Sequence, residues 1–255
     1  MEGRKYLRYW EGMMSNLNDF TIILLIIHIL GDFQLQTDKL TERKLEDKTA
    51  LYIHIGIHGI LLFILWIVCI FSSLIFEGLI IGILILLSHY ILDRIKIYLT
   101  KNTRIKESIL YIFDQISHIL IILVLSEIVF EGKLNTFTLT YIPRDILLWV
   151  LVILLITKPT NVTFKILFSK YQLKENINDK TVEGAGAIIG NLERILSVIF
   201  IETGNINSIA LVYTAKSIAR FKQIEENKSF AEYYLIGTLF SILSSILIFY
   251  VIFKL

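Results

Sequence analysis

The sequence predicts an all-α, polytopic integral membrane protein, a helical bundle with six or seven spans and one interfacial amphipathic helix. Hydrophobic residues make up 55% of the 255 residues, charged residues only 19%, and the mean hydropathy is +0.67. No Asp, Glu, Lys or Arg occurs in residues 50–76 or 233–253. Both runs exceed the ~20 residues that a spanning helix needs. They also lack the period-two alternation of barrel strands, which favours helices.

The other spans are predicted from shorter or less apolar runs. These runs are residues 20–35, 78–99, 109–129, 146–157, 184–201 and 205–219. The last of them is either a short span or a re-entrant helix. Pro159 ends the predicted span at residues 146–157, because proline cannot continue a helix cheaply. Residues 161–171 then predict the interfacial amphipathic helix. We expect two parts, a four-helix membrane half (1–143) and a C-terminal membrane half (144–255).

Loop charges predict the orientation and exclude one class of partner. The connections after the first, third and fifth predicted spans carry several Lys and Arg residues, whereas the second carries none and the fourth only two. The rich loops should face the cytoplasm, so we expect a multi-pass protein of a bacterial inner or cytoplasmic membrane. A net charge of +2 without a basic stripe argues against a nucleic-acid partner. The expected partner is the lipid bilayer.

All five histidines lie in apolar segments, and each has a histidine or aspartate four residues away. The pairs are His28 with Asp32, His54 with His58, His89 with Asp93, and Asp114 with His118. Residues spaced by four lie on one helix face, with Cβ atoms about 5–6 Å apart. The pairs alternate between the end and the start of successive spans, which run in opposite directions. All four should therefore meet in one layer at the cytoplasmic face.

Such a layer predicts a metal site. Imidazoles with carboxylates suit zinc, which we expect most, and also iron or manganese. Eight candidate ligands could hold two metals about 3.5–4 Å apart, or one metal with carboxylates orienting the histidines. Asp32 or Asp114 is the candidate general base. Interhelical hydrogen bonding is the simpler interpretation of any single residue. Ionisable groups inside a membrane are costly, however, and a set of eight favours function.

The same residues carry a family resemblance. The segments 28–36 (HILGDFQLQ), 89–93 (HYILD) followed by Lys96, and 114–118 (DQISH) resemble a bacterial membrane family known as domain of unknown function 3307. The segments 190–194 and 215–222 look like later blocks of that family. The resemblance implies no activity. In style, the His/Asp arrangement is also similar to that of the membrane-bound metal-dependent hydrolases, by analogy alone.

Other polar residues are candidates for binding the substrate. Two of them neighbour the His/Asp pairs and four interrupt the apolar C-terminal half: Gln36, Gln115, Glu193, Arg194, Lys216 and Arg220. The basic residues could hold an anionic lipid or an isoprenoid phosphate, although snorkelling of Lys216 and Arg220 to lipid headgroups is the simpler interpretation.

Three functions remain open from the sequence. The first is an integral membrane metal-dependent hydrolase that acts at the cytoplasmic interface on a membrane-associated substrate, such as a lipid or isoprenoid phosphoester. The second is a transporter of metal ions or protons, and the third is a scaffold braced by metal. A transporter needs a polar path to the far side. The outer halves of the second and fourth spans are apolar, which favours the enzyme or the scaffold.

Overall fold

The computed structural model describes residues 17–72, 74–129, 142–172 and 184–253. Every regular element within these ranges is a helix, which confirms the all-α class. The chain divides into two compact units. We call residues 17–151 the N-terminal unit and the part from residue 152 onwards the C-terminal unit, and we describe each by itself.

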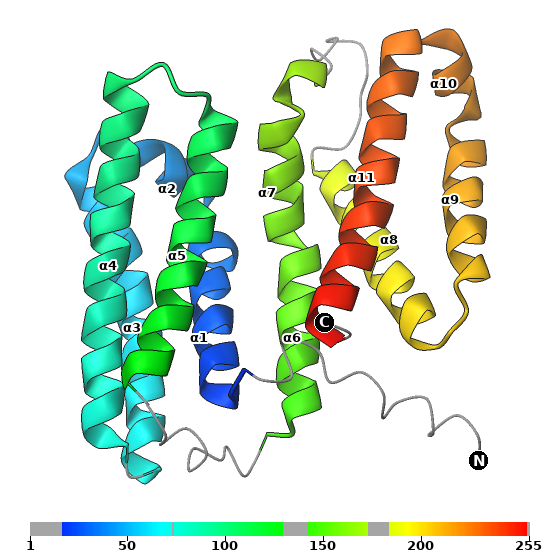
Figure 1. The fold of residues 1–255 in the computed structure, drawn as a ribbon. Helices are drawn as coiled ribbons and strands as arrows, with labels where there is room; N and C mark the ends of the chain where they lie inside the picture. Colours follow the sequence, from blue (N-terminus) through cyan, green and yellow to red (C-terminus); the bar gives the residue numbers. More distant parts are fainter. Residues whose placement is uncertain (1–16, 73, 130–141, 173–183, 254–255) are drawn as a thin grey trace, which may run out of the picture. The chain divides into compact units, whose positions relative to one another are not determined.

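The N-terminal unit is a bundle of four principal helices (Figure 1). Its elements are α1 (Asp19–Ile29), the π-helical turn η3 (Leu30–Gln34), the short α2 (Asp38–Arg43), α3 (Lys48–Phe71), α4 (Ile75–Asn102) and α5 (Glu107–Val129). Helix α4 packs between α3 and α5, and α1 contacts α3 and α5. The four helices that carry the predicted His/Asp pairs therefore share one core.

Side-chain caps explain where two of these helices begin. Asn18 accepts a hydrogen bond from the Thr21 amide (2.7 Å) at the start of α1. Asp47 accepts one from the Thr49 amide (2.7 Å) at the start of α3. That bond, together with Arg43, holds the pKa of Asp47 below its ordinary value. Both caps satisfy amides that the first helical turn leaves without partners.

Helix α6 (Arg144–Ile156) crosses the boundary between the units. The C-terminal unit continues with α7 (Lys158–Leu167), the 3-10 turn η5 (Ser169–Tyr171), α8 (Ala185–Glu202), α9 (Asn207–Ala219), α10 (Phe221–Glu226) and α11 (Lys228–Phe253). Helix α11 packs on α7, α8 and α10, and α9 packs on α8 (Figure 1).

Five helical segments are long and apolar enough to cross a membrane. They are α3, α4, α5, the segment Arg144–Leu167 that joins α6 to α7, and α11. The predicted total of six or seven spans is not confirmed within the described residues. Helix α1 has only 11 residues before the π-turn, and α9 has 13. Helix α8 has 18 residues, but Glu193, Arg194 and Glu202 interrupt its apolar sequence.

The segment after Pro159 differs from the expected interfacial helix. Helix α6 does end just before the proline, but α7 begins after a single intervening residue, Thr157, and has Pro159 in its first turn. Phe164 of α7 packs on α11, with its ring 5.4 Å from that of Phe240 and 5.6 Å from that of Tyr233. Residues of α7 therefore form part of a candidate span.

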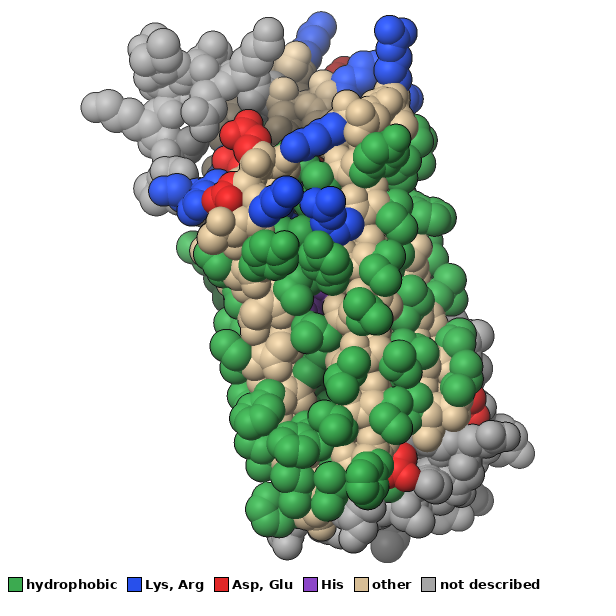
Figure 2. Space-filling view, turned by 90° about the vertical axis from the view of Figure 1, so that its left-hand side faces the viewer, with side chains coloured by type: hydrophobic (Ala, Val, Ile, Leu, Met, Phe, Trp, Pro, Cys, Tyr) green, Lys and Arg blue, Asp and Glu red, His purple; other side chains and the backbone are tan. Residues whose placement is uncertain are grey.

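The N-terminal unit has an apolar surface and buries its histidines in a core that is otherwise largely apolar. Its exposed side chains on α3, α4 and α5 include Ile60, Phe63, Leu87 and Phe113. In the space-filling view of Figure 2, hydrophobic side chains cover most of the visible face, and Lys and Arg side chains gather toward one end. All five histidines are buried. Lipid is the solvent that suits such a surface, because a soluble domain seldom exposes large contiguous apolar areas.

Candidate metal centre

The predicted His/Asp layer forms in the core of the N-terminal unit. Seven of the eight predicted ligands fall into three overlapping groups that could hold a metal ion, each with ligand atoms within 4.8 Å of one another. The groups are Asp32, His54, His58 and His89; His28, Asp32 and His118; and His89, Asp93 and His118. The eighth residue, Asp114, lies beside His118, with 3.6 Å between its Oδ1 and the ring Nδ1.

Three imidazoles converge on one carboxylate oxygen in the first group. The Nε2 atom of His58 lies 3.0 Å from Asp32 Oδ1, and the Nε2 atoms of His54 and His89 each lie 3.3 Å from it. The Nε2 atoms of His54 and His89 are 3.0 Å apart. Ligand atoms around a tetrahedral zinc ion are separated by about 3.3 Å, because the bonds are about 2.0–2.1 Å long. The spacing therefore fits one zinc-sized cation.

Hydrogen bonding alone does not account for this cluster of atoms. A neutral imidazole has one N–H donor and one acceptor. If His54 Nε2 donates to His89 Nε2, then His89 Nε2 has no proton with which to reach Asp32. If both Nε2 atoms instead donate to Asp32, their two N–H groups oppose each other at 3.0 Å. In either assignment at least one contact is repulsive. A shared cation removes this repulsion.

Local sequence explains how Asp32 reaches the other three helices. Helix α1 gives way to the π-turn η3 at Leu30, with Leu35 N bonded to Leu30 O. Such turns often occur at functional sites. A Cβ atom at Gly31 would overlap the imidazole of His58. Glycine at this position therefore lets the ring pack directly on the backbone that carries Asp32.

The outer carboxylates are held by lysines and an amide. Lys44 Nζ lies 3.3 Å from Asp93 Oδ2, and Lys96 Nζ lies 2.7 Å from Asp114 Oδ2. Gln115 Nε2 donates to Asp32 Oδ2 (3.0 Å) and to Asp114 Oδ2 (3.2 Å). Three carboxylates thus face two ammonium groups, which leaves one negative charge for a cation to balance when the histidines are neutral.

Four buried atoms of the cluster have no hydrogen-bond partner. They are His28 Nε2, His54 Nδ1, His118 Nε2 and Asp114 Oδ1. Buried polar atoms without partners are rare and costly, so each needs an explanation. A cation or a coordinated water would supply the missing partner of His28 Nε2, His118 Nε2 and Asp114 Oδ1.

Apolar side chains fill the bundle beyond the cluster. Leu62, Leu65, Ile81, Ile85 and Ile122 are buried on the turns of α3, α4 and α5 that lead away from the lysine-bearing end. Thr21 Oγ1 donates to Ser126 Oγ (3.0 Å) in the same region. The described core thus offers a cation a polar layer but no continuous row of polar groups past it.

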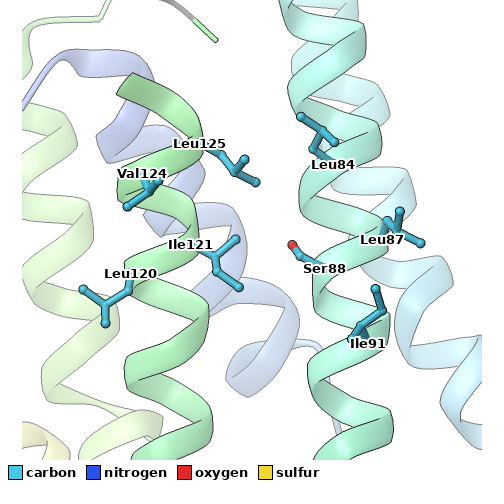
Figure 3. Close-up of a pocket in the computed structure, with 8 residues that line it drawn as sticks. All are labelled: Leu84, Leu87, Ser88, Ile91, Leu120, Ile121, Val124 and Leu125. Atoms are coloured by element: carbon cyan, nitrogen blue, oxygen red, sulfur yellow. The ribbon is translucent and has the colours of Figure 1, made fainter. Parts of the chain in front are cut away.

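An apolar groove of about 420 Å³ lies between α4 and α5 (Figure 3). Leu84, Leu87 and Ile91 line it from α4, and Leu120 and Val124 line it from α5. The only polar residue of the lining is Ser88. Ser88 precedes His89, and Leu120 follows His118 by two residues. The groove therefore starts at the level of the histidines and runs along the lipid-facing seam of the two helices.

The six predicted substrate-binding residues have different surroundings. Gln115 touches the centre, whereas Gln36 donates from Nε2 to Thr41 Oγ1 of α2. Glu193 and Lys216 pair with each other in the C-terminal unit, at 2.8 Å. Arg220 is half-buried and donates to Gln223 Oε1 (3.3 Å). A role for these residues in substrate binding stays a prediction.

Arg194 is bonded throughout its guanidinium group. Its Nε donates to the Ile156 carbonyl. Its Nη2 donates to Asn161 Oδ1 (2.5 Å) and Asn191 Oδ1 (2.8 Å), and its Nη1 donates to Ser241 Oγ (3.3 Å). Ile156 is the last residue of α6, whose final carbonyls lose partners at the break before α7. Arg194 thus ties α8 to that break.

Sequence reasoning missed the lysine partners. Lys96 appeared only as a part of the family motif, and Lys44 only as a loop charge. Lys96 follows Asp93 by three residues in α4, but it pairs with Asp114 of α5. Lys44 lies 49 residues before Asp93, and nothing in the sequence pattern joins the two.

The comparisons with known proteins identify a family and no activity. The model of the family described as "Protein of unknown function (DUF3307)" matches residues 20–148, slightly more than half of the chain. The matched range contains all eight predicted metal ligands, and the C-terminal segments 190–194 and 215–222 lie outside it. The searches of curated proteins and of solved structures each found no match, so nothing supports the similarity to metal-dependent hydrolases. From the family match, the chain belongs to the DUF3307 family.

Proposed function

We propose that this protein is an integral membrane, zinc-dependent hydrolase that acts on a long-chain, phosphate-containing substrate at the cytoplasmic face. The observation that carries the proposal is the convergence of the Nε2 atoms of His54, His58 and His89 on Asp32 Oδ1 at 3.0–3.3 Å. These atoms are drawn from three separate elements, and their spacing suits a tetrahedral ion. A buried set of this kind is expensive to build in a membrane protein without a function.

The residues beside the proposed ion have the chemistry that hydrolysis needs. A bound zinc ion supplies Lewis acidity and lowers the pKa of a coordinated water to about 7. Asp114 is the proposed general base, because its Oδ2 is held by Lys96 and Gln115 while its Oδ1 has no hydrogen-bond partner. Asp32 is the weaker candidate, because its two oxygens already face the imidazoles and Gln115.

The groove between α4 and α5 supports a long-chain substrate. Its lining is almost wholly apolar, and its volume of about 420 Å³ lies within the usual range for small-molecule sites, about 300–1,000 Å³. A hydrocarbon tail in this groove would end at the turn that carries His89. Lys96, whose side chain is 34% exposed, lies two turns further along α4, where an anionic headgroup would meet it.

Transport is the less favoured function, because the apolar core beyond the cluster gives an ion no polar path. A metal-braced scaffold is the second candidate, and burial favours it. The side chain of Asp32 is only 10% exposed, and those of the five histidines are 3% exposed or less. A closed site with four protein ligands is typical of structural zinc. Catalysis is therefore the property that separates these two candidates.

Elemental analysis of detergent-purified protein tests the metal. We expect zinc in the wild-type protein and a loss of the ion of the first group in the double variant His54→Ala/His58→Ala. Ser126→Ala is the matched control, because it removes a hydroxyl from the same bundle core outside the cluster. Wild-type protein that stays metal-free after supplementation with zinc would contradict the proposal.

Hydrolysis assays test the activity. We expect the zinc-loaded protein to cleave phosphomonoesters or phosphodiesters with long alkyl chains faster than their short-chain analogues. Val124→Trp, which fills the groove, should reduce this chain-length preference. Ile128→Trp, at an exposed position on α5 outside the groove lining, should leave it unchanged. Zinc-loaded protein without hydrolysis in either series would support the scaffold instead.

A further inference from the structure

We propose that the cluster holds two divalent cations that share the carboxylate of Asp32. The first lies among His54, His58, His89 and Asp32 Oδ1. The second lies among His28, His118 and Asp32 Oδ2. This inference rests on the proposed metal function and extends it, since it assigns the position at which substrate would bind.

The two histidines of the second site each have a buried Nε2 atom without a hydrogen-bond partner. His118 Nδ1 lies 2.8 Å from the Asp114 carbonyl oxygen, which can only accept, so this nitrogen carries the proton and donates it. The Nε2 of His118 is therefore the basic nitrogen, and it has no hydrogen-bond partner. Metal-binding histidines are commonly oriented in this way, with the other ring nitrogen donating to a carbonyl.

His28 completes the second site from the first helix. Its Nε2 is also buried without a hydrogen-bond partner, and it lies 3.8 Å from Asp32 Oδ2. The rings of His28 and His118 are stacked, with centroids 5.1 Å apart. One ligand atom from each of His28, Asp32 and His118 lies within 4.8 Å of the other two, as the ligands of one ion do.

Asp32 offers one oxygen to each site. Its Oδ1 faces the three imidazoles of the first site, while its Oδ2 faces His28 and accepts from Gln115. A carboxylate used in this way bridges two ions, and paired catalytic ions typically lie about 3.5–4 Å apart. The amide of Gln115 keeps the bridging carboxylate in this orientation.

The third group, His89, Asp93 and His118, competes with these two sites and is not a further one. It borrows His89 from the first site and His118 from the second. Each of these imidazoles has a single free lone pair, so it binds one ion at a time. Asp93 is moreover paired with Lys44 at 3.3 Å.

The two sites differ in the number of protein ligands. Four ligands close the first site, whereas three leave the second with an open position, the arrangement found in catalytic zinc sites. We therefore assign substrate binding to the second site. Two divalent cations would outweigh the single negative charge left by the three carboxylates and two lysines, so the centre would attract an anionic group such as a phosphate ester.

Metal stoichiometry and magnetic resonance test this proposal on the full chain in detergent. We expect two zinc ions per chain after reconstitution and, with Mn(II) in place of zinc, an electron paramagnetic resonance spectrum of two spin-coupled ions. The variants His28→Ala and His118→Ala should each retain one ion and show an uncoupled spectrum. Ser117→Ala, whose hydroxyl bonds to the Phe113 carbonyl beside the cluster, should keep two coupled ions.

The outcomes separate this inference from the proposed function. One zinc ion per wild-type chain, with an uncoupled Mn(II) spectrum, would overturn the second site and leave a one-ion hydrolase standing if hydrolysis persists. Two coupled ions without hydrolysis would support the second site and contradict the hydrolase. The wild-type measurement decides the matter even if the histidine variants fail to fold.

Discussion

The His/Asp cluster of the N-terminal unit contains buried polar atoms without hydrogen-bond partners. The arginine cluster of the C-terminal unit, formed by Arg194, Lys216 and Glu193, pairs its donors with acceptors. Three imidazole nitrogens crowd one oxygen of Asp32 in the first cluster. Arg194 in the second bonds to a carbonyl, two amide oxygens and a hydroxyl, and Lys216 pairs with Glu193. Both clusters are buried in apolar helices, so burial alone does not mark a functional site. Buried polar atoms without hydrogen-bond partners distinguish the first cluster.

This difference predicts what each cluster does. A cluster whose donors all have acceptors stabilises the fold, because each hydrogen bond within the protein replaces a hydrogen bond to water. A cluster with repulsive contacts and buried atoms without partners gains stability when a cation binds. Loss of metal should therefore follow changes in the first cluster, and loss of stability should follow changes in the second.

The largest expected effect is on metal affinity in His54→Ala/His58→Ala. The first site loses two of its four ligands, so we expect its affinity for zinc to fall by more than ~100-fold. Substitution of residues that only hydrogen-bond to a ligand typically lowers affinity by about 10–100-fold. Competition with a chromophoric chelator measures the affinity. Ser126→Ala should bind zinc like the wild type, and equal affinity in the double variant would end the distinction between the clusters.

Arg194→Met should destabilise the protein by about 2 kcal/mol or more, because it removes the guanidinium donors to the Ile156 carbonyl and to Asn161 Oδ1, whereas Asn191 Oδ1 keeps the bond from Asn161 Nδ2. Denaturant unfolding in detergent measures the change. Zinc affinity should stay at the wild-type value. Lys222→Met, whose side chain is 84% exposed, is the control and should change stability little. Release of zinc from folded Arg194→Met would show that the clusters are not independent.

Gly31→Ala sharpens the comparison without removing any ligand. The new Cβ atom would overlap the ring of His58, so we expect zinc affinity to fall by about 10-fold or more through displacement of that ring. Gly56→Ala is the matched control on α3, because no atom lies within 4 Å of its added Cβ. That substitution should leave zinc affinity unchanged and raise helix stability by up to about 1 kcal/mol. Unchanged affinity in Gly31→Ala would contradict a fixed ligand geometry.

The smallest expected effect concerns the ion pair of Glu193 and Lys216. A double-mutant cycle with Glu193→Gln and Lys216→Met should give a coupling energy of about 1–3 kcal/mol, since the two groups lie 2.8 Å apart and are largely buried. The same measurements should show wild-type zinc content in all three variants. A coupling near zero would mean that the pair contributes nothing to stability, contrary to the self-sufficient cluster described above.

The sequence predicted the helices of the N-terminal unit because their apolar runs are long and their polar residues are spaced by four. It also predicted the convergence of the pairs, since antiparallel spans must bring the end of one helix to the level of the start of the next. It did not predict the break of the helix at Leu30, because a π-turn is set by packing and not by composition. The interfacial position of residues 161–171 stays a prediction. Its sequence did not predict that Phe164 would pack on Tyr233 and Phe240 of α11, because that contact joins residues far apart in the chain.

Residue periodicity and helix direction by themselves determined that the protein is helical and apolar outside, and that four His/Asp pairs share a layer. Both are local properties that repeat along the chain. Only the tertiary structure decided which oxygen of Asp32 faces which histidine, that Lys44 and Lys96 hold the outer carboxylates, and that Arg194 is bonded on all sides. Those relations depend on the rotation of each helix about its axis and on side-chain packing between residues far apart in sequence, which no single segment specifies.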